Sequence, residues 1–547
     1  MTPIEAMLSI LREEGVTRVF GNPGTTELPF LDALVAAPDI PYVLGVHEGA
    51  VVAMADGYAR ATGRPAFVSL HVAAGLANGL SGLLNASRSR TPMVVTAGQQ
   101  DRRHLAQDPM LSGNLVELAR SAVKATFDVQ HAHDLPVMLR RAFRLAVLPP
   151  AGPVFLSVPM DLLAEETDVD VFDAPVAAPP AATGMASAAA LLARARRPAI
   201  VAGDGVGREG GVDALVALAE SVGAVVYHQP MHDGVDFPMG HDLYAGALPP
   251  VNAEIRRTLA PYDLVLIAGC HAFMPHHYSP GPALAPGTRV VQVDSDPTEI
   301  GRNFAVEFGL TGAIEPALRG IAERLRELRP EVGHRRVELR ERHLGARAAA
   351  ETAALKAYGP APLEPVAAAH AVASGLPIDA VVVEEAITTG VLLRRFLRLE
   401  RPRSLVHTVG GGLGFGIGAA IGAAMGDPDR PVVAVLGDGC AMFGLQGLWG
   451  AARYGVPVTF VVMNNGEYRT LKDTLDNWDS RATHAGQYPG LDLGPLDFGA
   501  AATFFGIEAR RVAHADELVD LVAGATHRDR PLLIDVPILG HRQGEHP

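Results

Sequence analysis

The stretch PVVAVLGDGCAMFGLQGLWGAARYGVPVTFVVMNNGEY, residues 431–468, decides the fold class. Its apolar runs 432–436 and 458–463 predict buried strands, and residues 441–454 predict a helix that ends at Gly455. A strand, a helix and a second strand form a βαβ unit, and its right-handed crossover places both strand ends at the same sheet edge. Asp438 and the pair Asn464–Asn465 follow these strands, so we expect them to meet at that edge.

These side chains have the chemistry of a metal and phosphate site. One acid, one amide and backbone carbonyls suit a magnesium ion that carries a phosphate ester, because magnesium prefers oxygen ligands and shares them with phosphates. A glycine-flanked helix N-terminus beside them favours the same ligand. For either motif alone, the alternative is that it forms only an ordinary tight turn. The two motifs at this spacing favour a cofactor site.

The alternation of strands and helices recurs in three blocks along the 547 residues. It predicts an α/β fold of three doubly wound parallel-sheet domains, at residues 1–180, 187–345 and 365–547. Segments rich in Pro and Ala, near 167–187 and before 365, read as linkers. The strands expected in the first two blocks are 18–21, 42–46, 66–70, 93–97, 198–203, 224–229, 264–269 and 289–294.

Composition excludes several functional classes. The chain is 48% hydrophobic and 19% charged with a formal net charge of −14, so no basic surface favours nucleic acid as a partner. Charged residues near the N-terminus argue against a signal peptide, and no apolar run is long enough to span a membrane, so we expect a cytoplasmic protein. The two cysteines, Cys270 and Cys440, are too far apart to indicate a disulfide framework or a structural zinc site.

The motif GDG (437–439) is followed some two dozen residues later by NN (464–465), and with this pair of motifs the sequence resembles the thiamine diphosphate (ThDP) enzymes. The resemblance covers essentially the whole chain and, within that superfamily, is strongest to the benzoylformate decarboxylases. It rests on GNPGTTELPFL (21–31), residues 70–100, GGGLGFGIGAAIG (410–422) and MNNGEY (463–468). The three blocks would then be the pyrimidine-binding, central and diphosphate-binding domains.

Glu48 follows the second predicted strand, where the family has a glutamate that hydrogen-bonds N1′ of the aminopyrimidine ring and assists deprotonation of thiazolium C2. The residue's position supports this role independently, because burial among apolar neighbours favours the neutral acid, which can exchange a proton with a ring nitrogen. The alternative is an acid that merely stabilises a helix N-terminus. The presence of GDG and NN in the same chain favours the catalytic role.

Other cofactor residues are implied by the resemblance alone. Asp438 and Asn465 match magnesium ligands, and Glu467 matches a position that ligates through its main-chain carbonyl. Further cofactor contacts are implied at Thr388 near the diphosphate, at Gly437 and Gly439, at Gly411 through its carbonyl to the 4′-amino group, and at Leu413, which forces the V shape.

Three positions match the substrate-binding groups of benzoylformate decarboxylases. Thr25 stands where the family has a serine that contacts the substrate carboxylate, and His71 and His276 match its two active-site histidines. Two histidines can divide the two proton transfers of a decarboxylation. A structural role is the alternative for a lone histidine. A slip of one residue would exchange His276 with His277, and a zinc site using both lacks an evident third ligand.

Three departures from the family pattern bear on the substrate. His47 precedes Glu48 where glutamine is expected, and Cys440 follows GDG where serine is usual. Thr474 stands near the position where the benzoylformate decarboxylases have a phenylalanine that lines the substrate pocket. Losing an aromatic wall changes pocket shape enough to shift substrate preference. The substrate class therefore stays open among aryl, branched and linear 2-oxo acids.

The resemblance implies a ThDP- and Mg²⁺-dependent decarboxylase that converts a 2-oxo acid to an aldehyde and carbon dioxide, with some carboligase activity. It also implies a homodimer or homotetramer with active sites between subunits. An acetolactate synthase-like carboligase, with FAD in the central domain, is one alternative. A second is a dinucleotide-binding oxidoreductase, suggested by GVGREG (205–210), although the acid expected after the next strand is missing.

Overall fold

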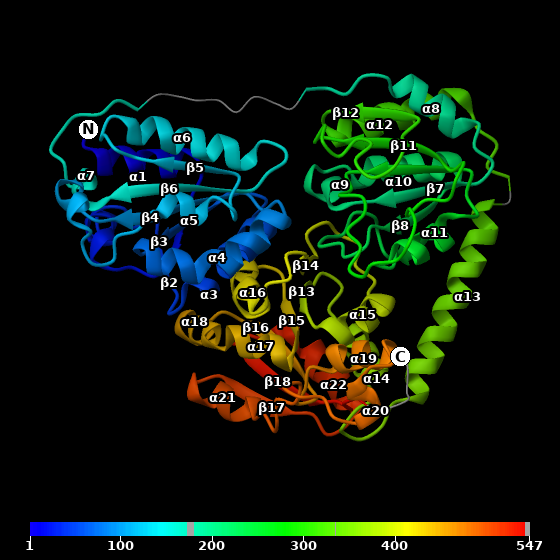
Figure 1. Cartoon of the computed structure of the whole chain (residues 1–547). Coiled ribbons are helices and arrows are strands. Elements are labelled where there is room, and N and C mark those ends of the chain that lie inside the picture. The colour runs from blue at the N-terminus through cyan, green and yellow to red at the C-terminus, as the bar shows by residue number, and fades with distance from the viewer. Residues whose placement is uncertain (172–179, 334, 542–547) are drawn as a thin grey trace. The chain divides into compact units, whose positions relative to one another are not determined.

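The computed structural model describes residues 1–171, 180–333 and 335–541 and contains three six-stranded sheets (Figure 1). Every strand ladder recorded in these residues is parallel. Apolar, β-branched runs such as residues 432–436 form strands buried on both faces, as expected where helices cover both sides of a parallel sheet. The predicted α/β fold with three parallel sheets is confirmed.

Each sheet is built from one of the three blocks. The first has the order β2 (Tyr42–Leu44), β1 (Val19–Gly21), β3 (Ala66–Leu70), β4 (Met93–Gln99), β6 (Pro153–Pro159), β5 (Ala125–Asp128). The second has the order β12 (Phe308–Thr311), β11 (Arg289–Asp294), β10 (Leu264–Ala268), β7 (Pro198–Ala202), β8 (Val225–His228), β9 (Tyr244–Ala247). The third has the order β14 (Leu405–His407), β13 (Val381–Glu385), β15 (Val432–Gly437), β16 (Val458–Asn464), β18 (Leu532–Pro537), β17 (Glu508–Arg511).

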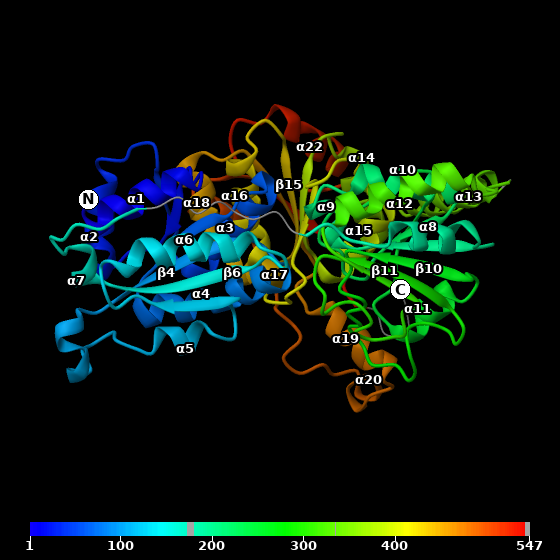
Figure 2. The same ribbon diagram turned by 90° about the horizontal axis from the view of Figure 1, so that it is seen from above.

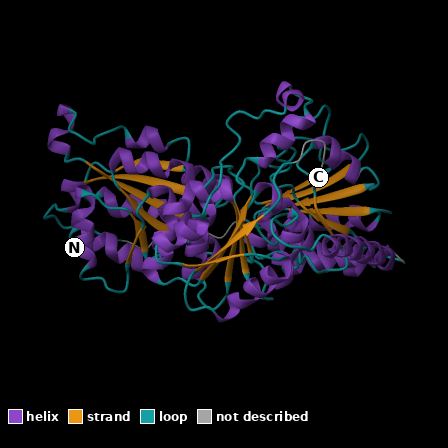
Figure 3. Cartoon of the chain, turned by 90° about the horizontal axis from the view of Figure 1, so that it is seen from below, coloured by secondary structure: helices purple, strands orange, loops and turns teal. Residues whose placement is uncertain are grey.

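Helices cover the sheets, which Figure 3 shows as stacks of strands between helices. Those of the first block are α1 (Pro3–Glu13), α2 (Leu28–Leu34), α3 (Glu48–Thr62), α4 (Val72–Arg88), α5 (Leu115–Ala119), α6 (Asp134–Val147) and α7 (Met160–Leu163). Those of the second are α8 (Met185–Ala193), α9 (Asp204–Arg208), α10 (Val212–Val222), α11 (Asn252–Leu259), α12 (Ile314–Leu328) and α13 (Arg335–Lys356). Those of the third are α14 (Pro365–Gly375), α15 (Ile387–Phe396), α16 (Phe415–Gly426), α17 (Asp438–Gly444), α18 (Leu448–Tyr454), α19 (Arg469–Asn477), α20 (Arg481–Ala485), α21 (Phe498–Phe504) and α22 (Ala515–Ala523).

The chain forms two compact units. One comprises Met1–Val176, Ala357–Leu392 and Thr408–Pro547, and the other comprises Ala177–Lys356 and Leu393–His407. The predicted linker at 167–187 lies partly outside the described residues. The exact domain limits therefore stay a prediction.

Residues 431–468 form the predicted βαβ unit, but the helix of this unit is interrupted. A 3₁₀ turn at Leu445–Gly447 separates α17 from α18. A Cβ atom on Gly444 would lie 2.5 Å from the carbonyl oxygen of Gly414, so the loop before α16 approaches the helix backbone where it breaks. The helix ends as predicted at Gly455, whose φ of 60° is left-handed and suits glycine.

Within the first unit, α3 packs closely against α16 (Figure 2). The helices meet through glycine backbones, because a Cβ atom on Gly57 would lie 2.0 Å from the Ala419 oxygen and one on Gly422 would lie 1.8 Å from the Met54 oxygen. Only small residues permit such an approach. The contact joins the helix that begins at Glu48 to the third sheet.

No helix in the described ranges is both long enough and apolar enough to cross a membrane.

Candidate active site

Glu48 is the first residue of α3, and its side chain is only 6% exposed. The amide of Asn22, after β1, donates to its Oε1 atom at 3.0 Å, and the amide of Asn78, in α4, donates to its Oε2 atom at 3.0 Å. The carboxylate is therefore buried as predicted, but two polar groups orient it where apolar neighbours were expected. Sequence reasoning missed both amides, although an asparagine inside a helix is a weak sign of a side-chain task.

His47 is the N-cap of α3. Its Nδ1 atom accepts a hydrogen bond of 3.0 Å from the backbone N–H of Gly49. An N-cap acceptor satisfies one of the N–H groups that a helix leaves unpaired at its start. His47 thus supports the helical turn that carries Glu48, which gives this departure from the family pattern a physical role.

His71 follows β3 and is held by a buried carboxylate. Its Nδ1 atom lies 2.9 Å from Oε2 of Glu27 and 3.2 Å from the hydroxyl of Thr26. Glu27 is 4% exposed and also accepts from the N–H groups of Gly24 and Gly98, at 2.8 and 3.0 Å. An ionised carboxylate only accepts, so Nδ1 carries the proton of the neutral ring. The Nε2 atom is thereby available as a proton acceptor.

Gly24 allows the His71 ring to lie directly over the backbone. A Cβ atom at Gly24 would be 2.2 Å from Cε1 of His71 and 2.4 Å from its Nε2. Thr25 is exposed, and its hydroxyl makes no hydrogen bond within the described ranges. The structure brings Thr25 next to the His71 site through the short 3₁₀ turn Thr25–Glu27, whereas the hydroxyl that contacts His71 belongs to Thr26.

Asp438 and Asn465 meet at the carboxyl edge of the third sheet, as predicted. Asp438 is 4% exposed, and its Oδ2 atom accepts from the N–H groups of Asn465 and Gly466, at 2.9 and 2.6 Å. Burial raises the pKa of Asp438 even though these N–H groups oppose the shift. No cationic side chain pairs with it in the described part of the chain. A metal cation would offset this desolvation, so the site suits one.

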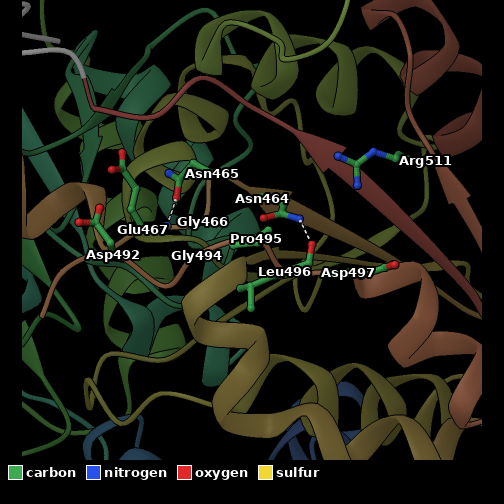
Figure 4. A pocket seen from close by; sticks show the side chains of 10 residues that line it. All are labelled: Asn464, Asn465, Gly466, Glu467, Asp492, Gly494, Pro495, Leu496, Asp497 and Arg511. Carbon is green, nitrogen blue, oxygen red and sulfur yellow. Dashed lines mark hydrogen bonds between the residues drawn. The ribbon is translucent and has the colours of Figure 1, made fainter.

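The two asparagines of the turn after β16 have different hydrogen-bond partners. Asn464 donates to the Leu496 carbonyl at 3.1 Å and to Asp535, so it supports the sheet edge, while the Asn465 oxygen accepts from the N–H of Glu467 at 3.0 Å (Figure 4). This turn lines a cavity of about 550 Å³. The other lining residues are Gly466, Asp492, Gly494, Pro495, Leu496, Asp497 and Arg511.

The loop that contains Gly411 and Leu413 is held from two sides. The Asn85 side chain, from α4, accepts from the N–H of Gly412 at 3.0 Å and donates to its carbonyl at 2.8 Å. On the other side, Glu385 at the end of β13 accepts from the N–H groups that start α16, at 2.8 to 3.1 Å. Gly411 has a φ of 79°, which strongly favours glycine. Neither Asn85 nor Glu385 was predicted.

Two other expected residues lie on neighbouring helices of the third block. The hydroxyl of Thr388, in α15, lies 2.6 Å from that of Thr470, in α19. Thr474 donates to the Thr470 carbonyl at 2.8 Å. The Thr388–Thr470 contact places the helix after the NN motif beside the residue expected near the diphosphate.

His276 belongs to the other compact unit and is exposed. Its Nδ1 atom lies 3.0 Å from Nε2 of His277, and burial together with His277 lowers the pKa of His276. The described residues contain no group of three His, Cys, Asp or Glu side chains placed to hold a metal ion, so a zinc site there is unsupported.

The start of the GVGREG turn (205–210) and Gly203 before it pack closely against Gly269 and Cys270, which follow β10. A Cβ atom on Gly203 would lie 2.4 Å from Cys270 Cα, and one on Gly205 would lie 2.9 Å from Gly269 Cα. Asp204 begins α9, where a phosphate would bind, and burial followed by repulsion from Asp233 raises its pKa. The acid at the first position of α9 disfavours a phosphate there.

Comparisons with known proteins agree with this geometry. Three family models match the chain: thiamine pyrophosphate enzyme, N-terminal TPP binding domain, over residues 1–127; central domain, over 185–321; and C-terminal TPP binding domain, over 388–536. Benzoylformate decarboxylase from Pseudomonas aeruginosa is 38% identical over 97% of this chain and 98% of its own. A putative acetolactate synthase large subunit from Mycobacterium tuberculosis is 30% identical, covering 98% and 99%.

Solved structures give the same result. A ThDP-dependent 4-hydroxybenzoylformate decarboxylase from Rhodococcus jostii superposes with a TM-score of 0.87 at 32% identity, covering 99% of this chain and 100% of that one. Benzoylformate decarboxylase from Polynucleobacter necessarius has a TM-score of 0.88 at 28% identity, covering 98% of each chain. This chain belongs to the thiamine pyrophosphate enzyme family and is a ThDP-dependent decarboxylase of the benzoylformate decarboxylase type.

Proposed function

We propose that the protein catalyses the non-oxidative decarboxylation of a 2-oxo acid to an aldehyde and carbon dioxide, with benzoylformate as the first substrate to test. The observation that carries the proposal is the His71 ring held on Glu27 at 2.9 Å, at the edge of the first sheet where α3 begins with Glu48. The relatives named as decarboxylases of benzoylformate and 4-hydroxybenzoylformate support the substrate class.

Bound thiamine diphosphate supplies a nucleophilic thiazolium carbon and an electron sink for the bond that breaks. Glu48 would hold the pyrimidine end of the cofactor and exchange a proton there, while Asn22 and Asn78 fix the orientation of its carboxylate. The Gly411 carbonyl and the Leu413 side chain would support the cofactor from the loop that Asn85 holds.

His71 would move a proton at its Nε2 atom, because Glu27 engages Nδ1. A ring fixed in one tautomer and one orientation is prepared for proton transfer to or from the substrate oxygen or carbon. Thr25, with an exposed hydroxyl on the adjoining turn, would bind the substrate carboxylate. His276 is the candidate for the second proton transfer.

Magnesium would bind at Asp438, Asn465 and the main-chain carbonyl of Glu467, with the diphosphate beside Gly437, Gly439 and Thr388. Support comes from the oxygen-rich donor set and from the buried Asp438 carboxylate, whose raised pKa a divalent cation would reverse. The ion would also neutralise the diphosphate.

We also propose a homodimer or homotetramer and a carboligase side activity. The second is supported by similarity to proteins named acetolactate synthase large subunits. An acetolactate synthase-like carboligase with FAD in the central domain is the alternative, and a flavin absorbance spectrum of the purified protein tests it.

The test is an aldehyde-release screen over aryl, branched and linear 2-oxo acids, with and without ThDP, Mg²⁺ and an acceptor aldehyde. We expect aldehyde and carbon dioxide in equal amounts from aryl 2-oxo acids, only when ThDP is present. Inactivity on every aryl acid would reject the benzoylformate assignment, and ThDP-independent turnover would reject the mechanism. A 2-hydroxy ketone formed only with the acceptor would support carboligation.

A further inference from the structure

The side chain of Glu467 is committed to protein contacts. It is largely buried, with its Oε2 atom accepting from Nζ of Lys472 and its Oε1 atom accepting from the backbone N–H of His541. A carboxylate with both oxygens engaged, one of them by an ammonium group, is poorly available to a metal ion. Glu467 would therefore take part in metal binding only through its main chain.

Lys472 is a buried lysine that the proposed chemistry does not use. It lies one turn into α19 and is 6% exposed, and it also donates to Oδ1 of Asp492 at 2.5 Å. The Nζ atom lies 5.6 Å from the centre of the Tyr488 ring. A buried ammonium is retained only where such partners compensate its desolvation. Figure 4 shows Glu467 and Asp492 side by side next to Asn465.

Glu467 is the last residue of turn 464–467, which is the proposed metal-binding turn. The N–H groups of Asn465 and Gly466 point at Asp438, and the Glu467 N–H points at the Asn465 side chain. The Gly466 carbonyl accepts from Leu493 at 2.7 Å, next to Asp492. Lys472 thus ties the turn to residues 491–493, to α19 and, through Glu467, to the C-terminal segment.

We propose that the Lys472–Glu467 ion pair is a positioning device that sets the conformation of turn 464–467 and thereby the affinity of the protein for Mg²⁺. The inference rests on the proposed magnesium site and assigns the two side chains a role beside it. Without the ammonium group, the buried Glu467 carboxylate would lose its counter-charge and turn toward solvent. This movement would displace the main-chain carbonyl of Glu467, the proposed magnesium ligand.

The test compares Lys472→Met with Lys472→Arg, and uses Lys356→Met as a matched control because Lys356 is exposed at the end of α13. Each variant is titrated with Mg²⁺ by calorimetry at saturating ThDP and without substrate. We expect Lys472→Met to raise the half-saturating Mg²⁺ concentration at least about tenfold, the scale seen when groups that orient metal ligands are removed. Lys472→Arg should stay within about threefold, because a guanidinium keeps the charge, and Lys356→Met should match the wild type.

Comparing Mg²⁺ affinity with kcat at saturating Mg²⁺ distinguishes a positioning role of Lys472 from a general loss of folded protein. At saturating Mg²⁺, kcat of Lys472→Met should return toward the wild-type value. If Lys472→Met fails to fold, Glu467→Gln, which keeps the size and removes the charge, should show the same weakening. A folded Lys472→Met with wild-type Mg²⁺ affinity overturns the inference. Wild-type protein that binds ThDP equally well without Mg²⁺ overturns the proposed metal site itself.

Discussion

The Nδ1 atom of His71 lies 2.9 Å from Oε2 of Glu27, and the two residues are 44 positions apart in the chain. Glu27 in turn accepts hydrogen bonds from the backbone N–H groups of Gly24, in the loop after β1, and Gly98, in β4. Its carboxylate is therefore held by both of these segments and by the ring of His71. A histidine held in this way has one nitrogen committed and one free for proton transfer. The arrangement assigns Glu27 a function that the sequence motif did not reveal.

Replacing Glu27 with glutamine should therefore impair turnover more than cofactor binding. The amide would set an NH₂ group against a backbone N–H or against the His71 ring, so the ring would lose its fixed tautomer. We expect kcat to fall at least about tenfold, a part of the contribution that a positioned acid–base group makes, with ThDP affinity unchanged by calorimetry. Glu117→Gln, an exposed site in the same domain, serves as the control. Unchanged kcat would contradict the role of Glu27.

Glu48→Gln tests the pyrimidine-side residue. The variant should bind ThDP, because the size of the side chain and one of its two acceptor contacts with Asn22 and Asn78 are kept. It should lose at least about a hundredfold in kcat, since an amide cannot exchange the proton. Steady-state kinetics together with ThDP calorimetry separate the two effects. Wild-type turnover in this variant would remove Glu48 from the mechanism.

Glu385 should make stability depend on pH. Burial, with a further contribution from Glu384, raises the pKa of Glu385 from its usual value of 4.5 to about 7. Because the folded protein holds the proton more tightly, the contribution is full below pH 4.5 and is lost as pH rises through about 7. The free energy of unfolding of Glu385→Gln relative to wild type should increase by up to about 3 kcal/mol between pH 4.5 and pH 8.

Urea unfolding at several pH values measures this difference, and Glu117→Gln again provides the control. A constant difference between the two proteins across that range would mean that Glu385 does not titrate there.

The central block should show the opposite sensitivity through His228. Burial lowers the pKa of this histidine from 6.5 to about 3, and its Nε2 atom accepts from Phe237 N–H at 3.0 Å. The unfolded chain binds the proton first, so stability is lost as pH falls from 6.5 toward 3, by about 1.4 kcal/mol per pH unit. His228→Gln should reduce this acid sensitivity in circular-dichroism melts at pH 7 and pH 5. Exposed His131→Gln should leave it unchanged.

The contact between α3 and α16 should be intolerant of a single methyl group. Gly57→Ala would place Cβ 2.0 Å from the Ala419 oxygen, and overpacking of this kind costs about 1–3 kcal/mol. We expect a lower Tm and weaker ThDP binding. Gly345→Ala is a matched control in the exposed helix α13, where no atom lies within 4 Å of the added Cβ, so its Tm should hold or rise slightly. Equal Tm values for the two variants would contradict the close packing.

Much of the fold could be predicted from local pattern. The expected strands at 66–70, 264–269 and 432–436 match β3, β10 and β15 to within a residue or two. Short or edge strands such as β9 and β14 were missed, because three or four residues with mixed polarity carry no clear period. The helix after GDG was predicted whole and is split, since the approach of Gly414 is not visible in its own sequence.

The candidate site divides in the same way. Asp438 and Asn465 could be brought together from sequence, because βαβ handedness and strand length place both at one edge of the sheet. The amides that hold Glu48 and the acid that holds His71 could not be predicted from sequence. They lie 26, 30 and 44 residues from the side chains that they hold, and the type of a side chain does not indicate which residue it contacts.

The sequence by itself therefore determined the three parallel sheets, the cofactor family and the residues that end the key strands, since these depend on local periodicity and on motif spacing. Only the tertiary structure decided how those residues are oriented. Asn85 reaches the Gly412 backbone across 327 positions, and Lys472 reaches Glu467 and Asp492 from a neighbouring helix. Such contacts arise when packing closes, because hydrogen bonds and ion pairs between distant segments depend on distances that packed helices and sheets set.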